Sequence, residues 1–389
     1  MSNIETLSAG SAEFEEAYGE PISRALDLST WRVGANMEEI YSRIGDEQIS
    51  ETLRFEAGNK PLIRAHVFSA IHERRAAPPG AGVYQATPQQ IERTHKGILF
   101  TGAVEAAKGT HFAHETVSIA VNQLGVCTIS YRGDQGTYLH RLFRRDLRAG
   151  TPGDLDVMLE LLDRRMKRAS TGAPDERDML SNLARRGIMA YAERAVLLEK
   201  SEAPWRMGDG NPAPMELLTG LGSMELLDRS LEMLHQLLLG HKRWVFVPVA
   251  SKDLLLLTIG QALNPLEYAI VETAQVSMRR IADAGSYERR YERKLREFVA
   301  EVGPRIVRGV YRVSCMGPPY VFYAHAEYAH EAALIALADS AMHEHRGFPM
   351  LIDLAGRICA GTFGMQALAA QLEVAYAMQG VSFEYAPGG

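Results

Sequence analysis

The stretch Ile98–Thr110, ILFTGAVEAAKGT, decides the fold of this chain. Its apolar and β-branched residues predict a buried strand that runs into a tight turn. Lys108 lies at the predicted turn, just before Gly109 and Thr110. A carboxylate at the end of a buried strand can help to hold a divalent cation, whereas an ammonium group repels one. The chemistry of the chain therefore depends on which acids accompany this lysine.

Strand and helix patterns alternate after this stretch. Val117–Gly133 is rich in Val and Ile and predicts a second long strand that bends near Gly125. Later strands are predicted at Arg243–Asp253, Leu266–Thr273, Gly309–Cys315 and Tyr320–Tyr328. Helical patterns lie between them, among them Asp154–Ala169, Pro174–Lys200 and Gly222–Gly240. We therefore expect an α/β fold with a mixed sheet.

The first 90 residues form a region of their own in the sequence. They are rich in helical patterns and carry no recognisable chemistry, and Ser29–Gly45 predicts an amphipathic helix. The Pro- and Gly-rich segment Arg75–Gly82 predicts a linker. We expect a helical N-terminal region at 1–90 and a second domain at 91–389.

Composition narrows the class of protein. Hydrophobic residues make up 46% and charged residues 23% of the 389 residues, which is typical of a globular protein. The net charge of −6 argues against wholesale electrostatic binding to nucleic acid, although a local basic groove is compatible with it. Cys127, Cys315 and Cys359 form no CxxC pair, which favours a reducing cytoplasm over a zinc knuckle or a disulfide framework. We expect no signal peptide and no membrane helix.

Acidic residues are the main candidates for chemistry. Hydrolysis of a phosphodiester with divalent metals needs carboxylates that converge on one point. The candidates are Glu105, Glu115, Asp134, Asp146, Glu193, Asp209, Glu216 and Asp353. Taken singly, each has an ordinary explanation, because Glu193 also fits a solvated helix face and Gly208-Asp209-Gly210 also fits a simple turn. The arginine-rich segment Tyr138–Arg148 is either a solvated sheet edge or a strip that contacts phosphates.

The order of these pieces resembles the NurA family of nucleases, which partner HerA-type hexameric DNA translocases. The family pattern begins with a strand that ends in Asp-Gly-Ser or Asp-Gly-Thr. It continues with an acid on a long helix, a second Asp-Gly, a strand end like VxxxSKD, and an acid or histidine near the C-terminus. The matching positions here, over residues 95–380, are Lys108-Gly109-Thr110, Glu193, Asp209-Gly210, Ser251-Lys252-Asp253 and Asp353. The first aspartate of the pattern is thus replaced by Lys108.

The resemblance implies a ribonuclease H-like fold and a dimeric DNA nuclease that uses Mn²⁺ or Mg²⁺. It implies that a HerA-like hexameric ATPase supplies the DNA, in end processing or phage defence. Glu193, Asp209 and Asp353 would be metal ligands, and Lys252 would contact the scissile phosphate.

Lys108 leaves alternatives open. An ammonium group about 4 Å from a metal ion costs roughly 1 kcal/mol per unit charge in water and about 4 kcal/mol at an effective dielectric of 20. Lys108 either points outward while Glu105 or Glu115 reaches in, or it replaces one metal ion. Otherwise the chain is a catalytically impaired NurA-like scaffold that binds and regulates the translocase. A third hypothesis is an unrelated α/β protein, which carboxylates lying far apart would favour.

Overall fold

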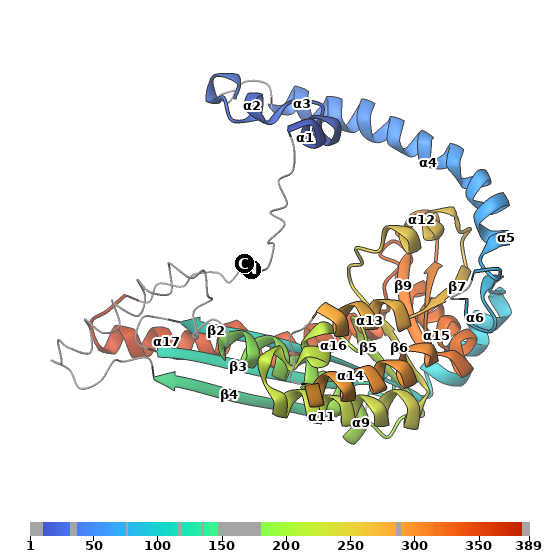
Figure 1. Ribbon diagram of the computed structural model, residues 1–389. Helices are drawn as coiled ribbons and strands as arrows, with labels where there is room; N and C mark the ends of the chain where they lie inside the picture. Colours follow the sequence, from blue (N-terminus) through green and yellow to red (C-terminus); the bar gives the residue numbers. More distant parts are fainter. Residues whose placement is uncertain are drawn as a thin grey trace. The chain divides into compact units, whose positions relative to one another are not determined.

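The computed structural model describes residues 11–31, 37–74, 77–115, 119–133, 136–146, 180–284 and 289–382. Asp134 and the predicted helix Asp154–Ala169 lie outside these ranges. The chain divides into two compact units, Met1–Asn59 and Lys60–Gly389. The larger unit contains the sheet and all of the candidate acids (Figure 1).

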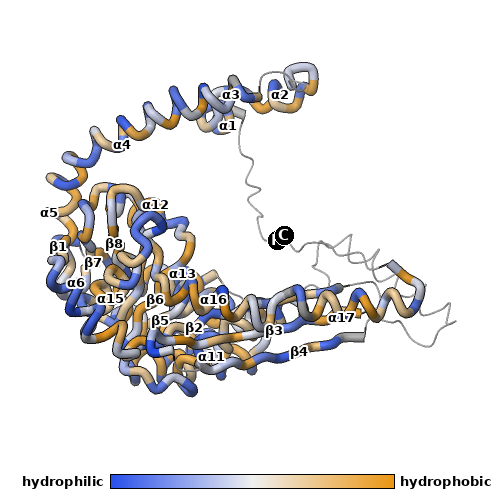
Figure 2. The backbone as a smooth tube through the Cα atoms, turned by 180° about the vertical axis from the view of Figure 1, so that it is seen from behind, coloured by the Kyte–Doolittle hydropathy of each residue, from blue (hydrophilic) through white to orange (hydrophobic). Residues whose placement is uncertain are grey.

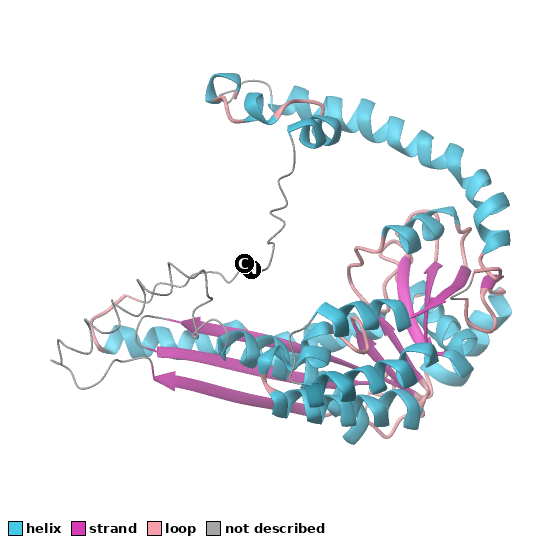
Figure 3. Cartoon of the chain, viewed as in Figure 1, coloured by secondary structure: helices cyan, strands magenta, loops and turns pink. Residues whose placement is uncertain are grey.

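A nine-stranded mixed sheet forms the centre of the larger unit, with the order β1-β7-β8-β9-β6-β5-β2-β3-β4 (Figure 3). The strands are β1 (Gly82–Gln85), β2 (Val104–Glu115), β3 (Ile119–Ile129), β4 (Tyr138–Asp146), β5 (Trp205–Asp209), β6 (Trp244–Val247), β7 (Glu267–Thr273), β8 (Ile306–Arg312) and β9 (Tyr320–His325).

One half of this sheet has the ribonuclease H-like arrangement. Strands β2, β3 and β4 form an antiparallel meander, β5 lies parallel to β2, and β6 lies parallel to β5. The remaining strands, β9, β8, β7 and β1, extend the sheet in antiparallel fashion beyond β6. The predicted α/β fold with a mixed sheet is therefore confirmed.

Helices cover both faces of the sheet. In the larger unit they are the last part of α4 (Ser50–Leu62), α5 (Phe68–Ala70), α6 (Pro88–Thr94), α9 (Met189–Glu199), α10 (Met215–Thr219), α11 (Met224–His235), α12 (Leu254–Ala262), α13 (Gln275–Ala284), α14 (Arg289–Val302), α15 (Ala329–Ala341), α16 (Met350–Phe363) and α17 (Met365–Met378). Alternate residues of β6 face opposite sides: Val245 and Val247 pack with α15 and α16, while Trp244 and Phe246 pack with α9 and α11. Hydrophobic residues accordingly concentrate in the central strands (Figure 2).

The opening sequence stretch folds differently from the prediction in one respect. Ile98 and Leu99 end a helical segment that begins at α6, where Thr87 and Gln90 form a capping box. Ile98 and Leu99 therefore belong to a helical segment, in which Leu99 is fully buried. Strand β2 begins later, at Val104. Lys108 therefore lies within β2 and not at a turn. A second difference is β5, which occupies Trp205–Asp209, where the Gly- and Pro-rich sequence had predicted only a turn.

The smaller unit is helical, as expected. Its described helices are α1 (Ser11–Tyr18), α2 (Ile22–Ala25), α3 (Met37–Arg43) and the first part of α4. The predicted division at residue 90 stays a prediction, although β1 already belongs to the sheet through its pairing with β7. Among the described residues, no helix combines the length and the apolar character needed to cross a bilayer.

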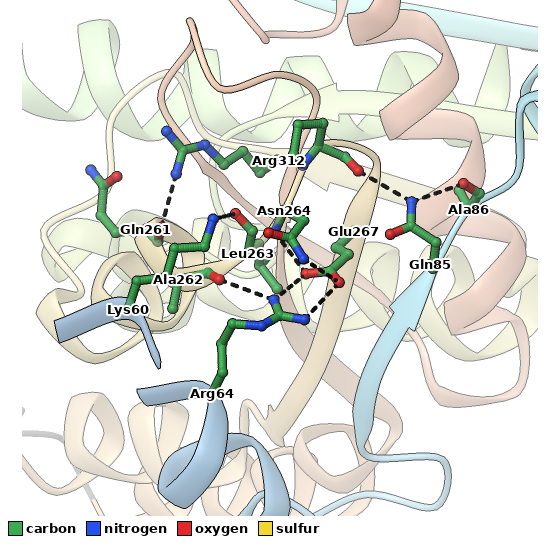
Figure 4. A network of polar contacts seen from close by, with 11 residues as sticks. Lys60, Arg64, Gln85, Ala86, Gln261, Ala262, Leu263, Asn264, Glu267 and Arg312 are labelled. Carbon is green, nitrogen blue, oxygen red and sulfur yellow. Dashed lines mark hydrogen bonds and ion pairs between the residues drawn. The ribbon is translucent and has the colours of Figure 1, made fainter. Parts of the chain in front are cut away.

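A polar network holds the helical segment around residue 64 to the sheet (Figure 4). Both carboxylate oxygens of Glu267 in β7 accept hydrogen bonds from Arg64, at 2.6 and 3.0 Å, and one also accepts from the Asn264 amide at 2.7 Å. Arg64 and Lys60 donate further to the carbonyls of Ala262 and Leu263 at the end of α12. Burial raises the pKa of Glu267, but the hydrogen bonds from Arg64 and Asn264 outweigh it and leave this pKa lowered.

We expect Arg64→Met to lower the free energy of unfolding by about 2 kcal/mol at pH 7, because it leaves a buried carboxylate without its charged donor. Since the folded-state pKa of Glu267 is lowered, this stability is present above the unfolded pKa and is lost as pH falls through the folded pKa. Urea unfolding at neutral and acid pH should show the two proteins converging in acid. Arg229→Met, which breaks an exposed ion pair with Glu225, is the control and should change little. An Arg64→Met effect independent of pH would contradict the assignment.

Candidate functional site

Strand β5 runs beside the first part of β2 and brings the first two motif positions together. The two strands are parallel, and Ala107 pairs with Gly208, so that Lys108 and Asp209 follow side by side. Gly210 turns the chain out of β5 with a φ of +81°, a left-handed conformation that favours glycine. The placement of Lys108 beside Asp209 is therefore a direct consequence of the sheet order.

Lys108 and Asp209 form an ion pair. Nζ of Lys108 lies 3.0 Å from Oδ2 of Asp209, and each side chain is only 23% exposed. The other carboxylate oxygen of Asp209 accepts a hydrogen bond from the amide of Val249, at 3.2 Å. Both oxygens of Asp209 are thus engaged by groups of the protein itself.

Glu193 is engaged in the same way from α9. Its Oε1 accepts from the amide of Gly109 at 2.8 Å, and its Oε2 accepts from Nη1 of Arg194 at 2.6 Å. The Arg194 side chain is 4% exposed and also donates to the carbonyls of Asp209 and Asn211. Burial raises the pKa of Glu193, while the Arg194 guanidinium and the Gly109 amide act against this rise.

Asp353 lies in the first turn of α16 and has its own cation. Its Oδ1 is 3.0 Å from Nη2 of Arg346. The centroid of the buried Phe348 ring lies 5.9 Å from Nζ of Lys108 and 5.6 Å from Cζ of Arg346. The carboxylate of Asp353 is thus directed to Arg346.

A glycine in α16 makes room for the lysine. Gly356 lies one turn beyond Asp353, and a Cβ added there would come within 2.9 Å of Cδ of Lys108. The stem of Lys108 thus packs against the helix, and its ammonium is directed at Asp209. Of the alternatives left open by the sequence, the outward-pointing lysine does not describe this structure.

The remaining candidates lie around the cluster or outside it. Lys252 is exposed in the loop between β6 and α12, and its neighbour Asp253 caps α12 and pairs with Arg308. Glu105 lies across from Arg206 in the register of β2 and β5, and Glu216 pairs with Arg186. The side chains of Glu115 and Asp146 and the whole of Asp134 lie outside what the structure describes.

These residues do not fit a divalent metal ion. Mn²⁺ and Mg²⁺ need several carboxylate oxygens left available by the protein. Here Asp209, Glu193 and Asp353 are each paired with a cation, and these cations are Lys108, Arg194 and Arg346. Within the described ranges, no group of at least three His, Cys, Asp or Glu residues is arranged to hold a metal. The sequence pattern identified the acids but did not identify Arg194 and Arg346 as their partners.

Comparison with known proteins finds similarity among solved structures. No protein-family model and no curated protein sequence matches the chain. The chain is similar to the NurA nuclease from Sulfolobus solfataricus, with 9% sequence identity and a TM-score of 0.46 over 91% of this chain and 100% of that one. It is also similar to NurA with manganese, with 10% identity and a TM-score of 0.36 over 75% and 95% of the two chains. A third similar structure is NurA bound to dAMP and manganese, with 9% identity and a TM-score of 0.36 over 69% and 88%. The order of the sequence motifs predicts the same resemblance.

Proposed function

We propose that this chain is a catalytically impaired NurA-like subunit that binds DNA and regulates a HerA-like hexameric ATPase. The observation that carries this function is the 3.0 Å ion pair between Lys108, within β2, and Asp209, at the end of β5. The Lys108 ammonium occupies the position at which a metal-dependent nuclease needs a carboxylate that is available to the metal. In this role the chain acts as a homodimeric scaffold in DNA end processing or phage defence.

The second candidate is an active nuclease that uses Mn²⁺ or Mg²⁺, with Lys252 at the scissile phosphate. One observation favours it, namely that Glu193 and Asp209 contact the adjacent residues Gly109 and Lys108 of β2. Asp353 lies on α16, which packs on Lys108 through Gly356. For this candidate, Lys108 would have to leave Asp209 when metal and DNA bind. The two candidates differ in one measurable property, the cleavage of DNA by the wild-type chain.

Cleavage of linear DNA with Mn²⁺ or Mg²⁺, with and without the HerA-like ATPase, tests the proposed function. We expect no product from the wild type, and we expect Asp209→Ala to behave in the same way. Both proteins should nevertheless change the rate of ATP hydrolysis by the translocase. Product formed by the wild type and lost in Glu193→Ala and Asp209→Ala would establish the second candidate instead. If the wild-type chain neither changed the rate of ATP hydrolysis by the translocase nor bound DNA, the scaffold role would be excluded.

A further inference from the structure

One face of α16 lies along β2 and β3 at close range. Gly356, Cys359 and Phe363 recur at helical spacing and share this face. Gly356 packs on Lys108 of β2, and a Cβ added to Gly125 of β3 would lie only 2.5 Å from Cβ of Phe363. Two glycines, one on each element, therefore allow the helix and the sheet to approach closely.

Cys127 lies in β3 between these two points of contact. It pairs with Lys108 in the register of β2 and β3, and it is two residues from Gly125 on the same side of the strand. Cys359 occupies the corresponding middle position on α16. Both cysteines are completely buried, and each thiol acts on the pKa of the other. Cys315, by contrast, is exposed.

The pKa values of the two thiols are shifted in opposite directions. The hydrogen bond from Cys359 lowers the pKa of Cys127, while the same contact and burial raise the pKa of Cys359. A thiolate is the form that reacts with oxidants, so one thiol of the pair must ionise before it reacts. Both thiols are buried, so reaction requires a local opening of α16.

We propose that Cys127 and Cys359 are an oxidant-sensitive pair, and that a peroxide oxidises the two thiols to a reversible disulfide. The Cys127 thiolate attacks one peroxide oxygen, the O–O bond breaks, and protonation of the leaving oxygen gives water and a sulfenic acid. The Cys359 sulfur then attacks the Cys127 sulfur, the S–O bond breaks, and a second water leaves with the thiol proton. In total, two thiols and one peroxide give one disulfide and two waters.

The bond would fasten α16 to β3 beside the acidic cluster. Asp353 and Gly356 lie on the same helix, so oxidation would fix both relative to Lys108. This inference does not depend on whether the chain cuts or regulates. In a reducing compartment the pair would stay as thiols until oxidant rises.

The full-length Cys315→Ser variant, which lacks the exposed thiol, provides the test. It is treated with hydrogen peroxide, and its intact mass is measured after unfolding without reductant. We expect the loss of two hydrogens, full reversal by dithiothreitol, a Cys127–Cys359 linked peptide, and a higher Tm for the oxidised form. Cys315→Ser/Cys127→Ser and Cys315→Ser/Cys359→Ser should show no such loss. An unchanged mass after prolonged treatment, oxygen added to either sulfur without a linkage, or a linkage between two chains would each overturn the proposal.

Discussion

Lys108→Asp is expected to bind Mn²⁺ at least about 100-fold more tightly than the wild type, because it removes a repulsion and adds an attraction, each worth up to about 4 kcal/mol near the surface. The substitution frees Oδ2 of Asp209 and places a new carboxylate beside it on the parallel strand. Calorimetric titration with Mn²⁺ measures the effect, and DNA cleavage measured with the same protein shows whether metal binding restores hydrolysis. We expect a new binding isotherm, and we expect Glu193→Ala in the same background to weaken it.

The matched control carries the same change of charge elsewhere. Lys96→Asp replaces an exposed lysine that is also ion-paired, in this case with Glu92 on the surface of a helical segment. It should bind Mn²⁺ no better than the wild type. Equal gains in the two variants would mean that net charge, and not the position beside Asp209, controls metal binding.

Arg194→Met is expected to be the most destabilising substitution in the cluster, lowering the free energy of unfolding by about 3–5 kcal/mol, because it leaves a buried charge unpaired. The Arg194 side chain is 4% exposed, and the carboxylate of Glu193 and the carbonyls of Asp209 and Asn211 all lose a donor together. Urea unfolding of the variant and the wild type under identical conditions gives the difference.

Two further variants separate charge from packing. Glu193→Gln combined with Arg194→Met should recover part of the loss, since the unpaired negative charge is removed. Arg186→Met breaks the ion pair with Glu216, but the Arg186 side chain is 58% exposed, so the expected cost is about 0–1 kcal/mol. If Arg194→Met proved as mild as Arg186→Met, the buried pair would not stabilise the fold as described.

Much of the fold could be predicted from local patterns. Runs of β-branched and aromatic residues predict strands at Leu266–Thr273, Gly309–Cys315 and Tyr320–Tyr328, and the structure has β7, β8 and β9 over parts of these runs, with β8 beginning three residues earlier, at Ile306. The start of β2 could not be predicted in this way. The helical segment that begins at the capping box of Thr87 continues through Ile98 and Leu99, so these two apolar residues are not part of the strand. Periodicity alone does not decide between helix and strand for such a short apolar run.

The three acids could be proposed from the sequence, but their pairing with cations could not. The order of Glu193, Asp209 and Asp353 along the chain follows a family pattern; the residues lie in α9, β5 and α16, and their role as metal ligands stays a prediction. The pairing of each acid with a cation depends on tertiary contacts. Arg346 precedes Asp353 by seven residues and meets it only because the chain turns between them. For the same reason, no local sequence motif predicts that Gly356 packs against Lys108.

A crystal of the wild-type chain grown with Mn²⁺, with anomalous scattering recorded near the manganese edge, tests the central claim most directly. We predict no anomalous peak among Asp209, Glu193 and Asp353, and we predict that Nζ of Lys108 stays within hydrogen-bonding distance of Oδ2 of Asp209. A manganese peak bound to Asp209 and Glu193, with Lys108 turned away from them, would contradict the account.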